Sequence, residues 1–263
     1  MKNLLAGAAI AAVFGFGGFF AAQQMQPEAP VAEAPVGLTD EQKAEVAGLV
    51  RTTLVAEPDI LEEASVALEA RRSEQEAERQ REVIGELRDD LFRSATDHVS
   101  GDLNGDVTLV EFFDYNCPYC RRAMQDVLTL MGTDPNLRVV FKEFPVLSQE
   151  SEDAALIAVA VQRQDDKYFE FHRKLMEQEG YIDEQVARQV AGDVGVDMTQ
   201  LDRDLQDPSV RAVIDANRAL GDNVGINGTP AYVVGDRVLV GAAPVEEIAA
   251  AISELRQQGC QVC

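Results

Sequence analysis

The chain has 263 residues, of which 46 are acidic and 23 are basic, giving a formal net charge of -23. Such an acidic surface repels phosphate backbones and anionic lipid headgroups, so we expect no nucleic-acid partner. The length is sufficient for a full hydrophobic core, and one medium-sized domain with a smaller region beside it is the expected organisation.

The first 22 residues carry an export pattern. Lys2 precedes the uncharged apolar stretch at 4–22, which is typical of a signal peptide. An uncleaved N-terminal membrane anchor is the alternative, because about 20 apolar residues can span a bilayer. In both cases the body of the protein is expected outside the cytoplasm. Residues 23–37, rich in Pro, Ala and Glu, are expected to form an extended linker.

Residues 38–95 are predicted to be a helical region. Thr39 and Gln42 form a capping-box pattern that opens a helix over 40–55, and Pro58 suits the first turn of a second helix. The second helix is apolar at both ends but almost wholly polar over 69–82. It is either a solvated connecting helix or an oligomerisation stalk whose apolar ends associate with copies of themselves.

From residue 96 the pattern changes to alternating strands and helices. The predicted elements are a strand at 107–113, a strand at 137–144, helices over 150–224, a hairpin at 231–241 that turns at Gly235 and Asp236, and a last helix at 244–257. This order predicts an α/β sheet with helices inserted midway.

Two thiols in Cys-Pro-Tyr-Cys follow the first strand. Cys117 and Cys120 could form a structural disulfide, half of a metal site or a redox pair. Cys117 stands where the strand changes to a helix, and a helix N-terminus stabilises a thiolate. Pro118 is well suited to the first helical position, and Cys120, one turn into the helix, would be shielded and react second. The junction therefore favours a redox pair.

The segment "VTLVEFFDYNCPYC" resembles the active-site segment of the DsbA family of thioredoxin-fold disulfide exchange proteins. Thr229 and Pro230 in "GTPAYVV" match the cis-proline loop of that family, and "DKYFEFHRKLM" resembles its inserted helical subdomain. The resemblance covers about 95–258. It implies a thioredoxin fold over 96–263, with the helical insertion at about 148–224, preceded by the N-terminal helical region.

The resemblance also implies roles for the residues of the motif. Cys117 would be the nucleophile that forms a mixed disulfide with a substrate, and Cys120 would resolve it. Pro118 and Tyr119 would tune the redox poise of the pair. No organic cofactor is needed for this exchange.

Two charged residues in apolar strands are further candidates. Glu111 and Lys142 occupy positions where related proteins keep a charged pair under the active site. Both charges stand in apolar runs, so we expect them either to pair or to face solvent. Their functional interpretation is proton transfer during exchange, and the structural alternative is an edge-strand salt bridge.

The cis-proline loop and the extra helices point to one branch of the family. Pro230, if cis, would lie beside the thiols, and the backbone of Thr229 would pair with an extended substrate. Thr229 is similar to the residue that disulfide isomerases carry, and the helices over 38–95 resemble the ScsC branch, in which such helices make an oligomer. This favours an isomerase, with a DsbA-like oxidase carrying a spacer as the alternative.

The same resemblance implies partners and a location. The substrates would be periplasmic proteins with thiols or disulfides, and a membrane redox partner would keep the pair oxidised or reduced. The protein itself would be periplasmic, either soluble or anchored at its N-terminus, and a homo-oligomer if residues 38–95 associate.

A second Cys-x-x-Cys pair, Cys260 and Cys263, ends the chain. No helix can follow it, so the activating geometry expected for Cys117 is absent here. A small terminal disulfide, a thiol relay to Cys117 and capture of a soft metal such as Cu(I) are the alternatives, in that order. A copper-binding or copper-protection protein that uses both pairs is thus a rival function. With only two histidines in the chain, no other metal site is expected.

Overall fold

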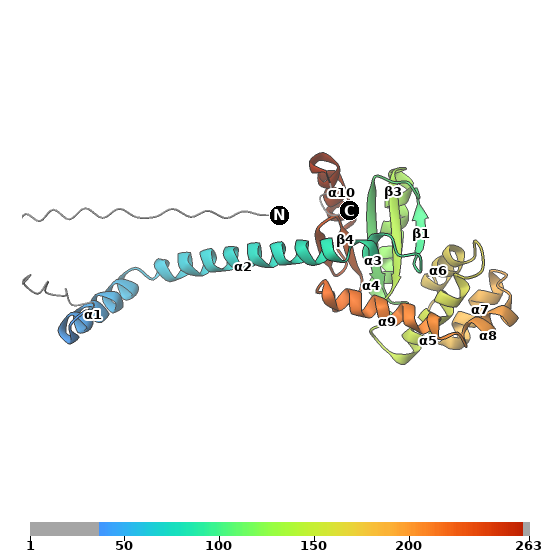
Figure 1. Cartoon of the computed structure of the whole chain (residues 1–263), viewed down its shortest axis with the longest axis horizontal. Helices are drawn as coiled ribbons and strands as arrows, with labels where there is room; N and C mark the ends of the chain where they lie inside the picture. The colour runs from blue at the N-terminus through green and yellow to red at the C-terminus, as the bar shows by residue number, and fades with distance from the viewer. Residues whose placement is uncertain (1–36, 260–263) are drawn as a thin grey trace, which may run out of the picture. The chain divides into compact units, whose positions relative to one another are not determined.

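The computed structural model describes residues 37–259, and Figure 1 shows its helices and strands. The chain divides into two compact units, Met1–Glu63 and Ala64–Cys263. Within residues 37–259, no helix has the length and apolar character needed to cross a membrane.

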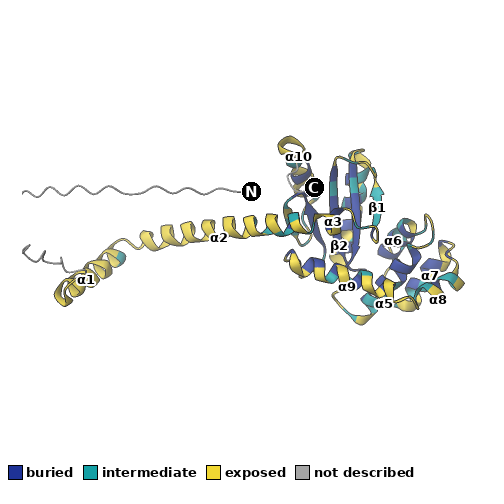
Figure 2. Cartoon of the chain, viewed as in Figure 1, coloured by how far each residue is buried: buried dark blue, intermediate teal, exposed yellow. Residues whose placement is uncertain are grey.

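The first unit contains helix α1, Asp40–Ala56, and the beginning of α2, Asp59–Glu86. The predicted capping box is present, since the Gln42 amide donates to the Thr39 hydroxyl and the Thr39 amide donates to the Gln42 side chain. No residue of α1 is buried, and Figure 2 shows α1 and most of α2 as exposed. These helices therefore present apolar side chains that the described chain does not cover.

The end of α2 belongs to the second unit and differs from the sequence prediction. The sequence pattern predicts one continuous second helix with an apolar end, but α2 ends at Glu86 and a short helix, α3, follows at Arg88–Phe92. The break at Leu87 lets Leu91 and Phe92 join Ile84 in a core on one face of the sheet. The predicted 38–95 region thus supplies buried residues to the sheet.

A five-stranded mixed sheet forms the centre of the second unit, with strand order β1-β3-β2-β4-β5. The strands are β1 His98–Gly101, β2 Val107–Phe113, β3 Leu137–Glu143, β4 Ala231–Val234 and β5 Arg237–Val240. Strands β2 and β3 are parallel, and the other neighbours are antiparallel. The short edge strand β1 was not predicted, because four residues carry too little alternation to be distinguished from a loop.

Helices cover both faces of the sheet and form an insertion between β3 and β4. The helices of this unit after α3 are α4 Pro118–Thr133, α5 Gln149–Val161, α6 Tyr168–Met176, α7 Glu184–Asp193, α8 Met198–Asp204, α9 Pro208–Asn223 and α10 Val245–Gln258. Helices α4 and α10 pack on one face, while α3 and the end of α9 pack on the other. The architecture is the predicted thioredoxin fold with a helical insertion.

Candidate active site

Cys117 is held at the point where β2 leads into α4. It is the N-cap of α4, with Pro118 at the first helical position. The Cys117 amide donates to the Asp114 carbonyl oxygen at 3.0 Å, and the Cys117 carbonyl oxygen accepts from the Arg121 amide at 3.2 Å. The sulfur therefore lies at the N-terminus of a 16-residue helix, where backbone N–H groups and the helix dipole favour a negative charge.

The two thiols differ in access and in acidity. Cys117 exposes 4% of its surface, and Cys120 exposes none. A hydrogen bond from the Cys120 side chain, assisted by the amides of Cys120 and Tyr119, lowers the pKa of Cys117 to about 5. Burial strongly raises the pKa of Cys120. At neutral pH the pair thus consists of one thiolate that keeps a small solvent-exposed surface and one fully buried thiol.

We expect iodoacetamide to alkylate Cys117 with a pH midpoint near 5, because the thiolate is the reacting form. Mass spectrometry of the peptide that contains Cys117 measures the rate separately from the other cysteines. Cys120→Ala is the matched variant: it removes the hydrogen-bond donor that lowers the pKa of Cys117, so we expect the midpoint to rise. A midpoint near that of a free thiol in the unchanged chain, about 8.5, would contradict the assigned geometry.

The loop before β4 lies against Cys117. The peptide bond between Thr229 and Pro230 is cis. In its protonated form the Cys117 thiol donates to the Thr229 carbonyl oxygen, and the sulfur lies 3.3 Å from that oxygen, across 112 residues of sequence. Backbone contacts hold this loop in place: the Pro230 carbonyl oxygen accepts from the Gly241 amide at 2.9 Å, and Ala231 pairs with Phe112 of β2. Four of the predicted site residues, Cys117, Cys120, Thr229 and Pro230, are thereby brought together.

Two side chains that the sequence analysis did not single out anchor the active-site loop. The Asp114 carboxylate accepts from the amides of Val146 and Leu147 at 2.9 and 3.1 Å. The Asn116 side chain accepts from the Ile182 amide and donates to the Ile182 carbonyl oxygen, both at 2.8 Å. The only sign of this role in the sequence is that short polar residues stand beside the thiol motif. Their hydrogen-bond partners are far away in the sequence. The loop is thus tied to the loop after β3 and to the helical insertion.

The thiol motif and the loop that Asp114 holds both expose apolar side chains. Tyr119, within the motif, is 54% exposed, and the Arg122 guanidinium lies 4.5 Å from the centre of its ring. Val146 and Leu147, held by Asp114, are also exposed. The surface beside Cys117 therefore combines apolar and cationic groups that a polypeptide can contact.

Glu111 lies under the active site, buried to 2% exposure on β2. It projects to the same face as Leu109 and Phe113, which pack in the core that contains Cys120. Burial raises the pKa of Glu111 to about 8, and its negative charge in turn contributes to the raised pKa of Cys120. A carboxyl group of this kind can exchange a proton near neutral pH.

The expected pair between Glu111 and Lys142 is not formed. In the parallel register of β2 and β3, Glu111 lies opposite Phe141 and Lys142 lies opposite Phe112, so the two side chains project to opposite faces of the sheet. Neither of them faces solvent, since Lys142 is 1% exposed. The prediction that the two charges either pair with each other or face solvent is therefore wrong, while proton transfer by Glu111 stays a prediction.

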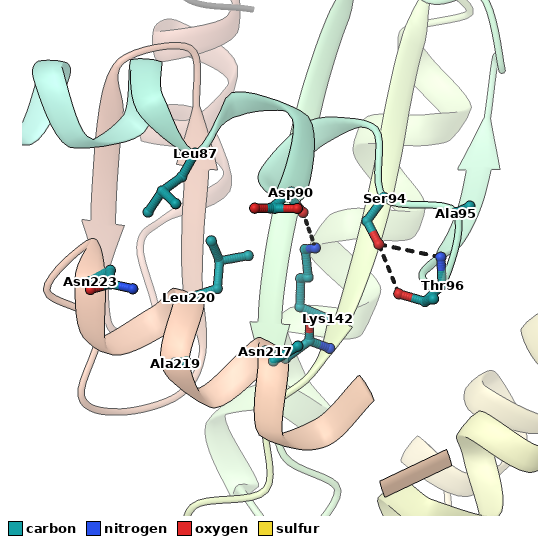
Figure 3. A pocket seen from close by; sticks show the side chains of 11 residues that line it. Leu87, Asp90, Ser94, Ala95, Thr96, Lys142, Asn217, Ala219, Leu220 and Asn223 are labelled. Carbon is teal, nitrogen blue, oxygen red and sulfur yellow. Dashed lines mark hydrogen bonds between the residues drawn. The ribbon is translucent and has the colours of Figure 1, made fainter. Parts of the chain in front are cut away.

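Lys142 instead has partners on its own face. Its Nζ donates to Asp97 Oδ2 and to the backbone carbonyl oxygen of Asp90, each at 2.5 Å. Figure 3 shows Lys142 at a pocket between α3 and α9, beside Asp90, Leu220 and Asn217. The structure thus assigns Lys142 to the junction of α3 with the sheet rather than to the thiols.

The second thiol pair, Cys260 and Cys263, lies outside the described residues, as do the leader at 1–22 and the linker up to 36. Among residues 37–259, no group of three or more His, Cys, Asp or Glu side chains is arranged to hold a metal ion. His172, one of the two histidines, is fully buried on α6 and packs against Phe113 and Phe141.

A thioredoxin fold with an activated thiol at a helix N-terminus and a cis-proline loop beside it defines a class of thiol proteins. The chain belongs to the family with the DSBA-like thioredoxin domain, whose family model matches residues 108–253. A second model, that of the Copper resistance protein ScsC N-terminal domain, matches residues 42–75. The two matches together confirm the resemblance to the ScsC-like branch.

Two curated relatives match the chain over different shares of their own length. The Na(+)/H(+) antiporter NhaA 1 of Salinispora arenicola is 29% identical over 161 residues, which are 60% of this chain and 24% of the antiporter. Disulfide bond formation protein D of Bacillus subtilis is 27% identical over 161 residues, which are 57% of this chain and 72% of that protein. The chain thus spans about a quarter of the length of the antiporter relative.

The chain matches several solved structures over nearly their whole length. A thioredoxin-like oxidoreductase from Silicibacter pomeroyi is 44% identical, with a TM-score of 0.63 over 65% of this chain and 98% of that chain. Proteus mirabilis ScsC in a transitional conformation is 28% identical, with a TM-score of 0.63 over 84% of this chain and 100% of that chain. A periplasmic thioredoxin-like protein from Salmonella enterica serovar Typhimurium is 29% identical, with a TM-score of 0.59 over 64% and 94%.

Proposed function

We propose that this chain is an exported thiol:disulfide exchange enzyme that forms or isomerises disulfides in periplasmic proteins, with isomerisation favoured. The observation that carries the proposal is the contrast between the two thiols, one a thiolate that keeps a small solvent-exposed surface and the other a fully buried thiol. The location is supported by the export pattern at 1–22 and by the periplasmic relative from Salmonella enterica.

The exchange begins when the Cys117 thiolate attacks a disulfide of the substrate. A bond forms between Cys117 Sγ and one substrate sulfur, and the other substrate sulfur leaves as a thiolate. If a different substrate thiolate then attacks the mixed disulfide, a rearranged substrate is released and Cys117 becomes a thiolate again. If Cys120 attacks instead, the substrate leaves reduced and the Cys117–Cys120 disulfide remains. Oxidation of a substrate is the reverse of this second route.

The surrounding residues would support these steps. The Thr229 backbone, beside Cys117, would pair with an extended segment of substrate, and Pro118 and Tyr119 would tune the redox poise. Glu111, on the side of Cys120, would take up the proton that Cys120 loses before it attacks. A membrane redox partner would restore the required oxidation state of the pair.

Assembly through residues 38–95 is the feature that would favour isomerisation. Helix α1 buries no side chain within the described chain, although most helical stability in proteins comes from packing of an apolar face. The match of residues 42–75 to the ScsC N-terminal domain covers these helices. Copies of the chain packed through α1 and the start of α2 would stabilise both helices and gather several Cys117 sites.

Serine substitutions at Leu49, Val50, Leu61 and Val66 test this proposal in the full chain. These side chains are exposed on α1 and α2, so their replacement leaves the core intact. A chain that starts at residue 95 would instead lack the buried residues Ile84 and Phe92. We expect the variant to sediment as a monomer and to lose most reactivation of a substrate with scrambled disulfides under mildly reducing conditions.

Leu103→Ser, at an exposed apolar position outside these helices, is the control, and Cys117→Ser is the blank. Undiminished isomerisation by a monomeric variant would refute the role of assembly. Rapid oxidation of a reduced substrate, with no isomerisation by the unchanged chain, would instead identify an oxidase whose N-terminal helices act as a spacer.

A further inference from the structure

A second buried polar side chain lies directly opposite Glu111. Tyr232 of β4 is the cross-strand partner of Glu111 in the antiparallel β2–β4 pair, so the two side chains share a face and their Cβ atoms lie about 5 Å apart. Tyr232 is fully buried in the core that contains Cys120. Within the described chain, neither the Tyr232 hydroxyl nor Glu111 Oε2 has a hydrogen-bond partner.

Two unpartnered polar atoms on neighbouring buried side chains require an explanation, because buried polar groups in folded proteins are normally hydrogen-bonded. Phenylalanine would fill the same space without the desolvation cost of the hydroxyl. A neutral Glu111 carboxyl group is stable without a hydrogen bond from Tyr232, whereas an ionised carboxylate in this buried place requires a hydrogen-bond donor. The hydrogen bond between the two side chains is therefore absent while Glu111 is neutral, and it can form when the carboxyl group loses its proton.

No cationic side chain competes for Glu111 on this face. The cation on the adjacent strand, Lys142, projects to the other face and is paired with Asp97. The titratable groups in the core on the Glu111 side are acids, or buried imidazoles whose pKa is lowered: Tyr115, Cys117, Cys120, Asp126, Glu143, Tyr168, Tyr232, His98 and His172. The cations on this side are engaged elsewhere, since Arg121 of α4 donates to the backbone carbonyl oxygens of Tyr115 and Gln178, and Arg237 of β5 is paired with Glu254. Helix α10 contacts this face through Ile248, Ala251 and Ile252, and the arginine near its end, Arg256, is paired with Asp106 and Asp134.

We propose that the Tyr232 hydroxyl is a positioning group for Glu111, donating a hydrogen bond, directly or through one internal water, to the carboxylate that accepts the proton of Cys120. This inference rests on the proposed function. In the resolving step the proton moves from Cys120 Sγ to Glu111, and the Cys120 thiolate attacks Cys117 Sγ. The bond between Cys117 and the substrate sulfur breaks, the substrate leaves as a thiolate, and Tyr232 keeps its own proton.

Tyr232→Phe in the full chain tests the proposal, since it removes one oxygen atom and keeps the ring. Cys260→Ser and Cys263→Ser in every variant restrict the reaction to Cys117 and Cys120. A mixed disulfide between Cys117 and thionitrobenzoate is prepared, and the absorbance of the released thiol reports the attack by Cys120 from pH 5 to 10. We expect release below pH 8 to slow about tenfold, with the pH midpoint moving upward by about one unit.

Three comparisons make the result specific. In a Glu111→Gln background, Tyr232→Phe should cause no further loss, because the carboxylate that the hydroxyl serves is absent. Tyr168→Phe removes another buried tyrosine hydroxyl, one that donates to Glu143, and should leave the midpoint unchanged. The carboxyl carbon signal of Glu111 in ¹³C-labelled protein should titrate at higher pH in Tyr232→Phe, which a merely structural tyrosine would not cause.

An unchanged midpoint in Tyr232→Phe, or an equal loss in the Glu111→Gln background, would overturn the inference. Failure of the proposed function gives a different result: the unchanged chain would then release thionitrobenzoate no faster than Cys120→Ser. The urea midpoint of each variant shows that the fold is retained.

Discussion

Replacing Cys120 by serine is expected to trap substrates as mixed disulfides on Cys117. The Cys117 thiolate remains able to attack, but the serine hydroxyl cannot displace the substrate sulfur, so the covalent complex accumulates. We expect turnover in the route that forms the Cys117–Cys120 disulfide to fall by roughly 10³-fold or more. Non-reducing gel electrophoresis after incubation with a substrate that contains a disulfide reveals the complex.

Cys117→Ser is the matched control for this experiment. With Cys260→Ser and Cys263→Ser present in both variants, the buried thiol of Cys120 is then the only thiol left. Its raised pKa and complete burial predict no covalent complex. Complexes of equal yield from the two variants would mean that the roles of the two thiols are not those assigned by the geometry.

Replacing Asp97 by alanine is expected to destabilise the fold by about 3–5 kcal/mol, because it leaves the buried charge of Lys142 without its partner. Burial lowers the pKa of Lys142 and Asp97 opposes that effect, so the pKa falls further in the variant. Between that lowered value and 10.5, the unfolded chain binds more protons than the folded chain. The stability defect should therefore shrink as the pH is raised toward 10.

Urea unfolding at pH 7 and pH 9.5 measures both parts of this prediction. Arg79→Ala, which breaks the exposed pair with Glu76, is the control and should cost less than about 1 kcal/mol. Combining Asp97→Leu with Lys142→Met should restore most of the stability, since an apolar pair replaces the buried ions. A single Asp97→Ala variant as stable as the control would show that Lys142 finds another partner.

Local patterns in the sequence predicted most of the fold. The apolar run at 107–113 and the turn at Gly235 and Asp236 became β2 and the β4–β5 hairpin, because period and turn chemistry are properties of neighbouring residues. The Cys117–Cys120 junction was likewise readable, since a strand, a proline and a helix pattern meet within a few residues.

The features that the sequence did not disclose depend on contacts between distant residues. The register of β2 with β3 decides which face Lys142 takes, and a shift by one residue would have placed it beside Glu111. Asp97 stands in a short polar stretch with no periodic pattern, and only the fold brings it to Lys142. The two hydrogen bonds of Asn116 to Ile182 join residues that are 66 positions apart.

The projection of Glu111 and Lys142 to opposite faces separates the electrostatics of exchange from the electrostatics of folding. A change of charge at Asp97 or Lys142 acts across α3 and α9, while a change at Glu111 acts on Cys120. Neither Asp97 nor Lys142 is among the main groups that shift the pKa of Cys117 or Cys120. Variation on one face can therefore alter how firmly the protein is folded while the pH dependence of the thiols stays the same, so the two properties are free to evolve independently.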